Sequence, residues 1–215
     1  MDIRKLQKAV GEAGFDGWLF CDFNNRDAIA YRILGLDFEK FTSRRWFYLV
    51  PSSGEPIRLV SKVEPSRLDS LPGEKRTYLS WRDLADELER MLRGKNVAMQ
   101  YSPEDAIPYV SLVDAGMIDL VRAAGARIGS SADLVQVFEA VIDDAGYQTH
   151  VEAGRLIHAI KDEAFALIGD SVKNGKGLTE YDVQRFIIRR FEEQGLDCMG
   201  EFPIVGVNGH PSDPH

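Results

Sequence analysis

The sequence predicts an α/β protein built in two parts. Over the first ~140 residues, short runs rich in β-branched and aromatic residues alternate with amphipathic helical patterns across short connections, which is typical of a sheet flanked by helices. Two of these runs, 45–51 and 56–61, are separated by turn residues that include Gly54, and this spacing predicts a hairpin and therefore a mixed sheet. After about Asp143 the pattern changes to two long helices and a single strand.

The elements of the first part follow from apolar spacing and from the glycines that end helical patterns. Helices are expected at 3–10, 26–34, 81–92 and 113–124, and strands at 16–21, 45–51, 56–61, 77–79, 96–101 and 126–129. Ser131 is expected to cap a further helix. The three tryptophans fall on apolar strands or at a helix start, so Trp18, Trp46 and Trp81 are expected to pack in the core.

In the second part, residues 151–172 form a long helical pattern that a glycine-containing stretch interrupts. Thr179 is a good N-cap for the next helix, and 201–207 reads as a strand that leads into a loop of turn formers. A strand followed by an unclosed loop lacks partners, so we expect the chain to be the front part of a larger protein. We expect a boundary between 140 and 148, with Gly146 as a flexible point, giving domains 1–142 and 143–215.

Composition excludes several classes of protein. The net charge is −8 and no basic stripe is visible, so nucleic acid is not an expected partner. No apolar run has the length of a membrane span, and the N-terminus opens an amphipathic helix rather than a signal peptide, so we expect a cytoplasmic protein without membrane contact. Cys21 and Cys198 form no CxxC motif, and two buried thiols in a reducing compartment are expected.

Residues 151–215 combine a long helix, a glycine-containing break, a Thr179-Glu180-Tyr181 helix start, and a Pro203-Ile204-Val205 strand whose loop closes on Pro214-His215. This segment resembles the opening of the pita-bread metallopeptidase family. The first ~140 residues, with the motifs at 44–48, 97–103 and 113–116, resemble the domain that precedes it in the aminopeptidase P, prolidase and creatinase branch. The resemblance implies a creatinase/prolidase-like N-terminal domain with a mixed sheet flanked by helices, followed by an incomplete α+β pita-bread catalytic domain.

His215 is the one site residue that the resemblance assigns, as a catalytic and substrate-binding group beside the metal centre. An imidazole N–H can donate to a developing oxyanion, which suits that role. The alternative is a terminal histidine without any role. His210 stands where the family commonly carries Asn. A zinc site formed by His210 and His215 alone is not expected, because Pro211 and Pro214 stiffen the loop and no third ligand is near.

The resemblance also implies a cofactor and a substrate for the complete protein. The family holds two divalent metal ions (Mn, Co or Zn) with two aspartates, a histidine and two glutamates that follow this loop, so no metal ligand and no cofactor is expected in this chain. The complete protein would be a metal-dependent Xaa-Pro aminopeptidase or prolidase that hydrolyses the bond preceding proline in short peptides, as a homodimer, and the chain as given would be inactive. The alternatives are a creatinase-like hydrolase that works without metal, and a non-catalytic peptide-binding module.

Overall fold

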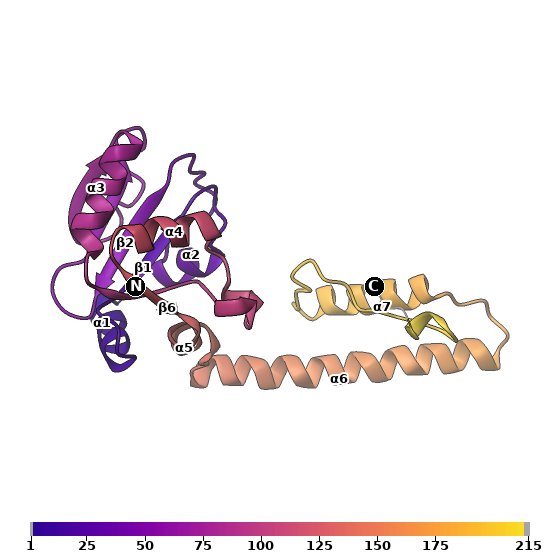
Figure 1. Ribbon diagram of the computed structural model, residues 1–215. Coiled ribbons are helices and arrows are strands. Elements are labelled where there is room, and N and C mark those ends of the chain that lie inside the picture. The colour runs from indigo at the N-terminus through magenta and orange to yellow at the C-terminus, as the bar shows by residue number, and fades with distance from the viewer. Residues whose placement is uncertain (1, 213–215) are drawn as a thin grey trace. The chain divides into compact units, whose positions relative to one another are not determined.

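The computed structural model describes residues 2–212 and separates into two compact units, Met1–Val141 and Ile142–His215 (Figure 1). This division falls inside the expected interval of 140–148. Gly146, which was expected to be a flexible point, lies in the first turn of a long helix, where its N–H donates to the Oδ1 atom of the N-cap residue Asp143 at 2.8 Å.

The first unit is built on a mixed sheet of six strands in the order β4-β3-β2-β1-β5-β6. The strands are β1 (Gly17–Asp22), β2 (Trp46–Pro51), β3 (Ile57–Ser61), β4 (Glu74–Tyr78), β5 (Asn96–Met99) and β6 (Arg127–Ser130). The antiparallel pairing of β2 with β3 confirms the predicted hairpin, and β1 pairs antiparallel with β2 but parallel with β5. Because β1 is central and buried along its whole length, its sequence is almost continuously apolar.

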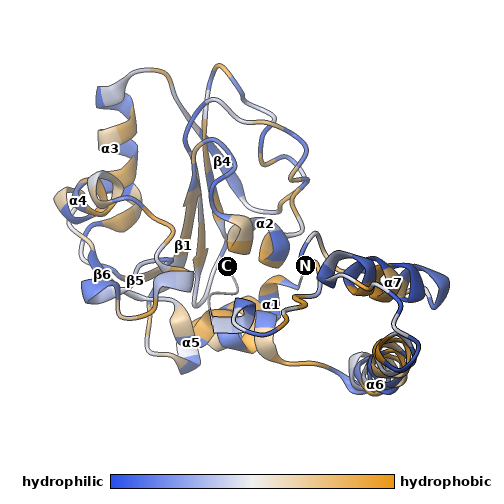
Figure 2. Cartoon of the chain, turned by 90° about the vertical axis from the view of Figure 1, so that its right-hand side faces the viewer, coloured by the Kyte–Doolittle hydropathy of each residue, from blue (hydrophilic) through white to orange (hydrophobic). Residues whose placement is uncertain are grey.

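Helices cover both faces of this sheet, as Figure 2 shows. On one face lie α1 (Ile3–Glu12), α2 (Ala28–Leu34), α5 (Ala132–Val135) and the π-helical turn η3 (Gln136–Ala140), and on the other lie α3 (Trp81–Leu92) and α4 (Ala115–Ala123). Alternate side chains of β1 serve the two cores, with Trp18 and Phe20 on the first face and Leu19 and Cys21 on the second. The connection after β5 contains two short 3₁₀ turns, η1 (Pro103–Asp105) and η2 (Pro108–Val110).

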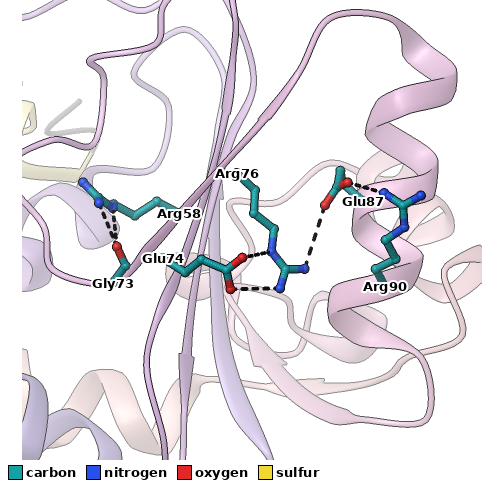
Figure 3. Close-up of polar contacts among 6 residues, drawn as sticks. All are labelled: Arg58, Gly73, Glu74, Arg76, Glu87 and Arg90. Atoms are coloured by element: carbon teal, nitrogen blue, oxygen red, sulfur yellow. Dashed lines mark hydrogen bonds and ion pairs between the residues drawn. The ribbon is translucent and has the colours of Figure 1, made fainter.

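Charged side chains occupy the edge strand β4 (Figure 3). The Arg76 guanidinium donates to both carboxylate oxygens of Glu74, at 2.8 and 2.9 Å, and lies 3.8 Å from the carboxylate of Glu87 on α3. Arg90 forms an ion pair with the same Glu87. A charged edge of this kind disfavours pairing with a strand of another molecule, and the pairs also join the edge strand to its covering helix.

Three local predictions need correction. Trp18 and Trp46 are buried as expected, but Trp81 is 60% exposed, because it is the first residue of α3 and the buried face of that helix begins at Leu84. Ser131 makes no capping hydrogen bond. Of the two cysteines, Cys21 is buried but Cys198 is only partly buried.

The second unit consists of α6 (Asp144–Lys173), α7 (Glu180–Glu193) and the 3₁₀ turn η4 (His210–Ser212). Thr179 caps α7 in a reciprocal capping box with Asp182, which confirms its predicted role. Arg190 of α7 donates to Glu163 of α6 at 2.6 Å, so the two helices are linked by charge as well as by packing.

The predicted strand at 201–207 is wrong for the described residues. A strand needs a neighbouring strand to complete its hydrogen bonds, and none pairs with this segment within residues 2–212. Instead, the Gln184 side chain of α7 donates to the Pro203 carbonyl oxygen at 2.8 Å. Separately, no helix in the described part of the chain has the length and apolar character needed to cross a membrane.

The turn before β4 generates a stability prediction. Gly73 has φ +119°, and an added Cβ would collide with the Pro56 carbonyl oxygen, which accepts the N–H of Glu74 at 2.9 Å. Gly73→Ala should therefore lower the free energy of unfolding by about 3 kcal/mol, through backbone strain and a backbone clash. Chemical denaturation measures this change.

Gly54→Ala is the matched control, because Gly54 also has a positive φ of +95° but open space around it. That variant should lose about 1 kcal/mol. Equal losses in the two variants would show that the close approach to Pro56 contributes nothing.

Candidate functional site

Four side chains gather at the edge of the first unit where β1 ends and β2 begins. We call Phe23, Arg26, Arg45 and Trp81 the arginine–aromatic cluster. The guanidinium carbon of Arg26 lies 5.6 Å from the centre of the Phe23 ring, and that of Arg45 lies 5.6 Å from the Phe23 ring and 6.0 Å from the Trp81 ring. Neither arginine forms an ion pair with an acidic residue among those described.

The buried carboxylate of Asp22 fixes the loop that carries Phe23 and Arg26. It accepts the backbone N–H groups of Asn25, Arg26 and Asp27 at 3.0, 2.7 and 3.0 Å. The loop turns through Asn24 and Asn25, whose φ angles are 67° and 55°. Asparagine tolerates this left-handed conformation better than most residues do, so the sequence suits the turn that the carboxylate stabilises.

Asp22 also connects this loop to the rest of the core. The Tyr31 hydroxyl lies 3.1 Å from Asp22 Oδ2 and 2.9 Å from Asn25 Oδ1, and the buried Arg67 donates to the Tyr31 hydroxyl at 2.5 Å. Arg67 also lies over the Tyr31 ring, 5.0 Å from its centre. A chain of buried polar contacts, from Asp22 through Tyr31 to Arg67, therefore anchors the loop in the core.

Glu64 and Tyr78 hold the segment that carries Arg45. The Glu64 carboxylate accepts the Thr42 hydroxyl at 2.8 Å, the Ser43 hydroxyl at 2.6 Å and the Arg44 backbone N–H at 3.2 Å. Burial opposes ionisation of Glu64, but the hydrogen bonds from Ser43 and Thr42 outweigh it and hold the pKa of Glu64 below its ordinary value. The Tyr78 hydroxyl donates to the Arg45 carbonyl oxygen at 2.8 Å.

Trp81 is placed by the start of α3. Ser80 caps this helix, since its hydroxyl accepts the Asp83 N–H at 3.2 Å while the Asp83 carboxylate accepts the Ser80 N–H at 3.0 Å. The Asp83 carboxylate also accepts the Leu79 N–H, and its hydrogen bonds from the Ser80 and Leu79 N–H groups lower the pKa of Asp83. The capping box fixes the backbone of Trp81 at the first helical position, and its ring stays largely exposed.

This arrangement suits recognition of an anion. A guanidinium stacked on an aromatic face keeps its N–H edge free, and that edge matches the two oxygens of a carboxylate. Sequence reasoning did not single out any of the four residues as a site. The adjacent Arg44 and Arg45 before a strand were the available signal, but Phe23 and Trp81 lie 58 positions apart and only the fold brings them to the same arginine.

In the second unit, Glu180 holds the loop that precedes η4. Its carboxylate accepts the Val207 N–H at 2.6 Å and lies 2.8 and 3.0 Å from the Nδ1 atom of His210. The contact with His210 is the main cause that lowers the pKa of Glu180. His210 is thus a partner of α7. His215, the predicted catalytic and substrate-binding residue, lies outside the described residues, so its role stays a prediction.

An apolar groove of about 390 Å³ lies between α6, α7 and residues 203–206. Its lining includes Ile157, Phe165, Val183 and Ile204, and Phe165 and Ile204 remain more than half exposed. An apolar face this open is typical of a surface that another segment covers.

No group of three or more His, Cys, Asp or Glu side chains between residues 2 and 212 is arranged to hold a metal ion. The metal ions implied by the resemblance therefore find no fitting set of ligands among these residues, and we assign no ligand to any of them.

Comparison with protein-family models finds no match, and comparison with curated protein sequences finds none either. Solved structures do match. A dipeptidase PepE from Mycobacterium ulcerans matches with a TM-score of 0.54 and 17% identity over 89% of this chain and 48% of that chain. A prolidase from Thermococcus sibiricus matches with a TM-score of 0.51 and 16% identity over 90% of this chain and 50% of that chain.

The chain therefore spans about half the length of the solved prolidase and dipeptidase chains that it matches. At these identities the match shows the fold alone, and it agrees with the mixed sheet and flanking helices described above. The chain therefore shares its fold with about half of these prolidase and dipeptidase chains, and the mixed sheet flanked by helices is as the sequence predicted.

Proposed function

We propose that this chain is the N-terminal half of a cytoplasmic Xaa-Pro peptidase of the prolidase or aminopeptidase P type. The first unit serves as the N-terminal domain, and the second unit begins the catalytic domain. In the complete protein, two divalent metal ions would supply an activated hydroxide for attack on the peptide bond before proline. Their ligands would lie beyond the described residues, and the enzyme would act as a homodimer on short peptides.

The observation that carries this proposal is the match along 89–90% of the chain to a prolidase and a dipeptidase of about twice its length. The match includes both units rather than the sheet domain alone. The second unit supports the same proposal, because a sheet supplied by further chain would cover its open apolar groove and pair with its segment at 201–207, which pairs with no strand within residues 2–212.

The arginine–aromatic cluster gives the first unit a role in this proposal. A dipeptide substrate carries a free carboxylate next to the proline ring. The guanidinium groups of Arg26 and Arg45 have no acidic partner within residues 2–212 and lie beside the Phe23 and Trp81 rings, which suits a carboxylate attached to an apolar ring. Recognition by this edge would favour substrates that end at proline, and hence a dipeptidase over an aminopeptidase that accepts longer chains.

The direct test is an assay of the complete gene product with Xaa-Pro dipeptides and manganese, cobalt or zinc. Metal-dependent turnover supports the proposal, while residues 1–215 alone should show none. Turnover of small non-peptide substrates without metal would indicate a creatinase-like enzyme, and peptide binding without turnover would indicate a binding module. A reading frame that stops at residue 215 would contradict the proposal outright.

Substitution of Arg45 tests the assigned recognition role. In the complete enzyme, Arg45→Ala should raise KM for a Xaa-Pro dipeptide about tenfold to a hundredfold, because a charge-assisted hydrogen bond is lost. The KM for the matching dipeptide amide, which lacks the carboxylate, should change little. Steady-state kinetics on both substrates measures the difference.

Arg127→Ala on β6 is the control, since Arg127 is exposed and has no ion pair among the described residues. It should leave both KM values unchanged. If Arg45→Ala raised the two KM values equally, the carboxylate would not be what Arg45 recognises.

His215 has a separate prediction. In the complete enzyme, His215→Ala should slow hydrolysis on the order of 10²–10³-fold, because one donor to the developing oxyanion is lost. Metal content and melting temperature should stay near those of the unmodified enzyme. Loss of metal would make His215 a ligand instead, and near-normal activity with full metal content would show that it has no catalytic role.

A further inference from the structure

A small crevice lies where the chain changes sides of the sheet. The connection after β1 leads to α2 on one face, whereas the connection after the neighbouring parallel strand β5 leads to α4 on the other face. Such a reversal leaves a gap at the carboxyl ends of the two strands. The gap has a volume of about 20 Å³, enough for one water molecule. Its lining includes Cys21, Asp22, Arg26 and Asp27 from the end of β1 and the loop that follows, and Asp114 from the connection before α4.

Asp27 is the buried acid of this crevice, with 1% of its surface exposed. One carboxyl oxygen, Oδ1, accepts the Ala30 N–H at 2.9 Å and caps α2. The other oxygen, Oδ2, is buried and has no hydrogen-bond partner among the described residues. Burying an ionised carboxylate costs much free energy when one of its oxygens has no hydrogen-bond donor. A protonated carboxyl group is neutral and needs only one acceptor or a water molecule for its O–H.

The charged groups around Asp27 also favour its protonated form. Asp22 on β1 and Asp114 at the N-cap of α4 are both acidic, and the basic side chains near it, Arg26 and Arg32, are exposed. Burial, reinforced by the charge of Asp22, raises the pKa of Asp27 to about 7. Burial together with Asp27, Asp22 and Asp114 likewise raises the pKa of the Cys21 thiol, so the thiol stays protonated.

We propose that Asp27 is a proton-operated switch for the loop after β1: the protonated side chain keeps the crevice closed, and ionisation loosens residues 22–30. This segment carries Phe23 and Arg26, so the switch acts on half of the arginine–aromatic cluster. It is independent of the proposed enzymatic function, because it concerns only the conformation of the described chain.

The direction of the pH dependence follows from proton binding. An opened loop exposes Asp27 to water and returns its pKa toward the ordinary value of 3.8. Between about pH 4 and pH 7 the closed form then binds more protons than the open form, so raising the pH favours opening by up to about tenfold per unit. Above pH 7 both forms are ionised, and the equilibrium becomes independent of pH.

Hydrogen exchange of residues 22–30, corrected for the intrinsic effect of pH, measures this opening in the chain as described. From pH 5 to pH 7 protection should fall at least tenfold, and from pH 8 to pH 9 it should stay level. Asp27→Asn keeps an oxygen for the α2 cap but cannot ionise, so its protection should stay flat across the whole range. Asp143→Asn makes the same change at the exposed N-cap of α6 and should behave like the unmodified chain.

The carboxyl carbon signal of Asp27 in the unmodified chain provides a second readout that needs no variant. Its midpoint is expected near pH 7. A midpoint near pH 4, or protection of residues 22–30 that does not change between pH 5 and pH 7, would overturn the proposal. So would an Asp27→Asn variant that keeps the pH dependence of the unmodified chain.

Discussion

The edge of the first unit depends on one buried carboxylate, that of Asp22. Three successive backbone N–H groups and the Tyr31 hydroxyl converge on it, and through Tyr31 it is joined to the buried guanidinium of Arg67. Without this acceptor, the buried N–H of Asp27 and the partly buried N–H groups of Asn25 and Arg26 would lose their hydrogen-bond partner, at a cost of about 1–3 kcal/mol for a buried donor. The position of Phe23 and Arg26, the entry into α2 and the burial of Asp27 all follow from this single constraint.

The topology of the sheet explains why polar groups collect at this edge. The carboxyl ends of β1 and β5 meet where the following helices go to opposite faces, and the antiparallel pairing of β1 with β2 brings the start of β2 to the same edge. Arg45 therefore comes within reach of Phe23 although 22 positions separate them, and the capped start of α3 adds Trp81. The edge strand β4 differs from this site, because Arg76 and the nearby Arg90 form ion pairs with Glu74 and Glu87, so their charges are already balanced by carboxylates.

Much of this fold follows from local pattern. The hairpin of β2 and β3, the helix at 81–92 and the N-cap at Thr179 are visible in spacing and turn chemistry, because these signals depend on residues close in sequence. The strand expected at 201–207 fails, since a strand is defined by a partner that local sequence does not supply. The prediction that Trp81 is buried is wrong for a different reason. Tryptophan favours burial, but this residue is the first of α3 and lies outside the buried face of that helix.

The candidate site was largely hidden from the sequence. The ion pairs Arg32–Glu139 and Arg190–Glu163 and the arginine–aromatic cluster join residues whose separation carries no recognisable spacing. The resemblance pointed to His215 instead, at a place that the described residues do not reach. The raised pKa of Asp27 also depends on burial and on neighbours from two elements, neither of which a sequence pattern contains.

The most direct test of the central constraint is the mobility of the arginine side chains, measured by heteronuclear NOE at their Nε atoms. In the unmodified chain, Arg26 and Arg45 should be more rigid than Arg127, which has no ion pair among the described residues. In Asp22→Ala, which removes both acceptor oxygens, Arg26 should become as mobile as Arg127, while Arg45, held through Glu64 and Tyr78, should stay rigid. An Arg26 that keeps its rigidity in this variant, or that already matches Arg127 in the unmodified chain, would contradict the account.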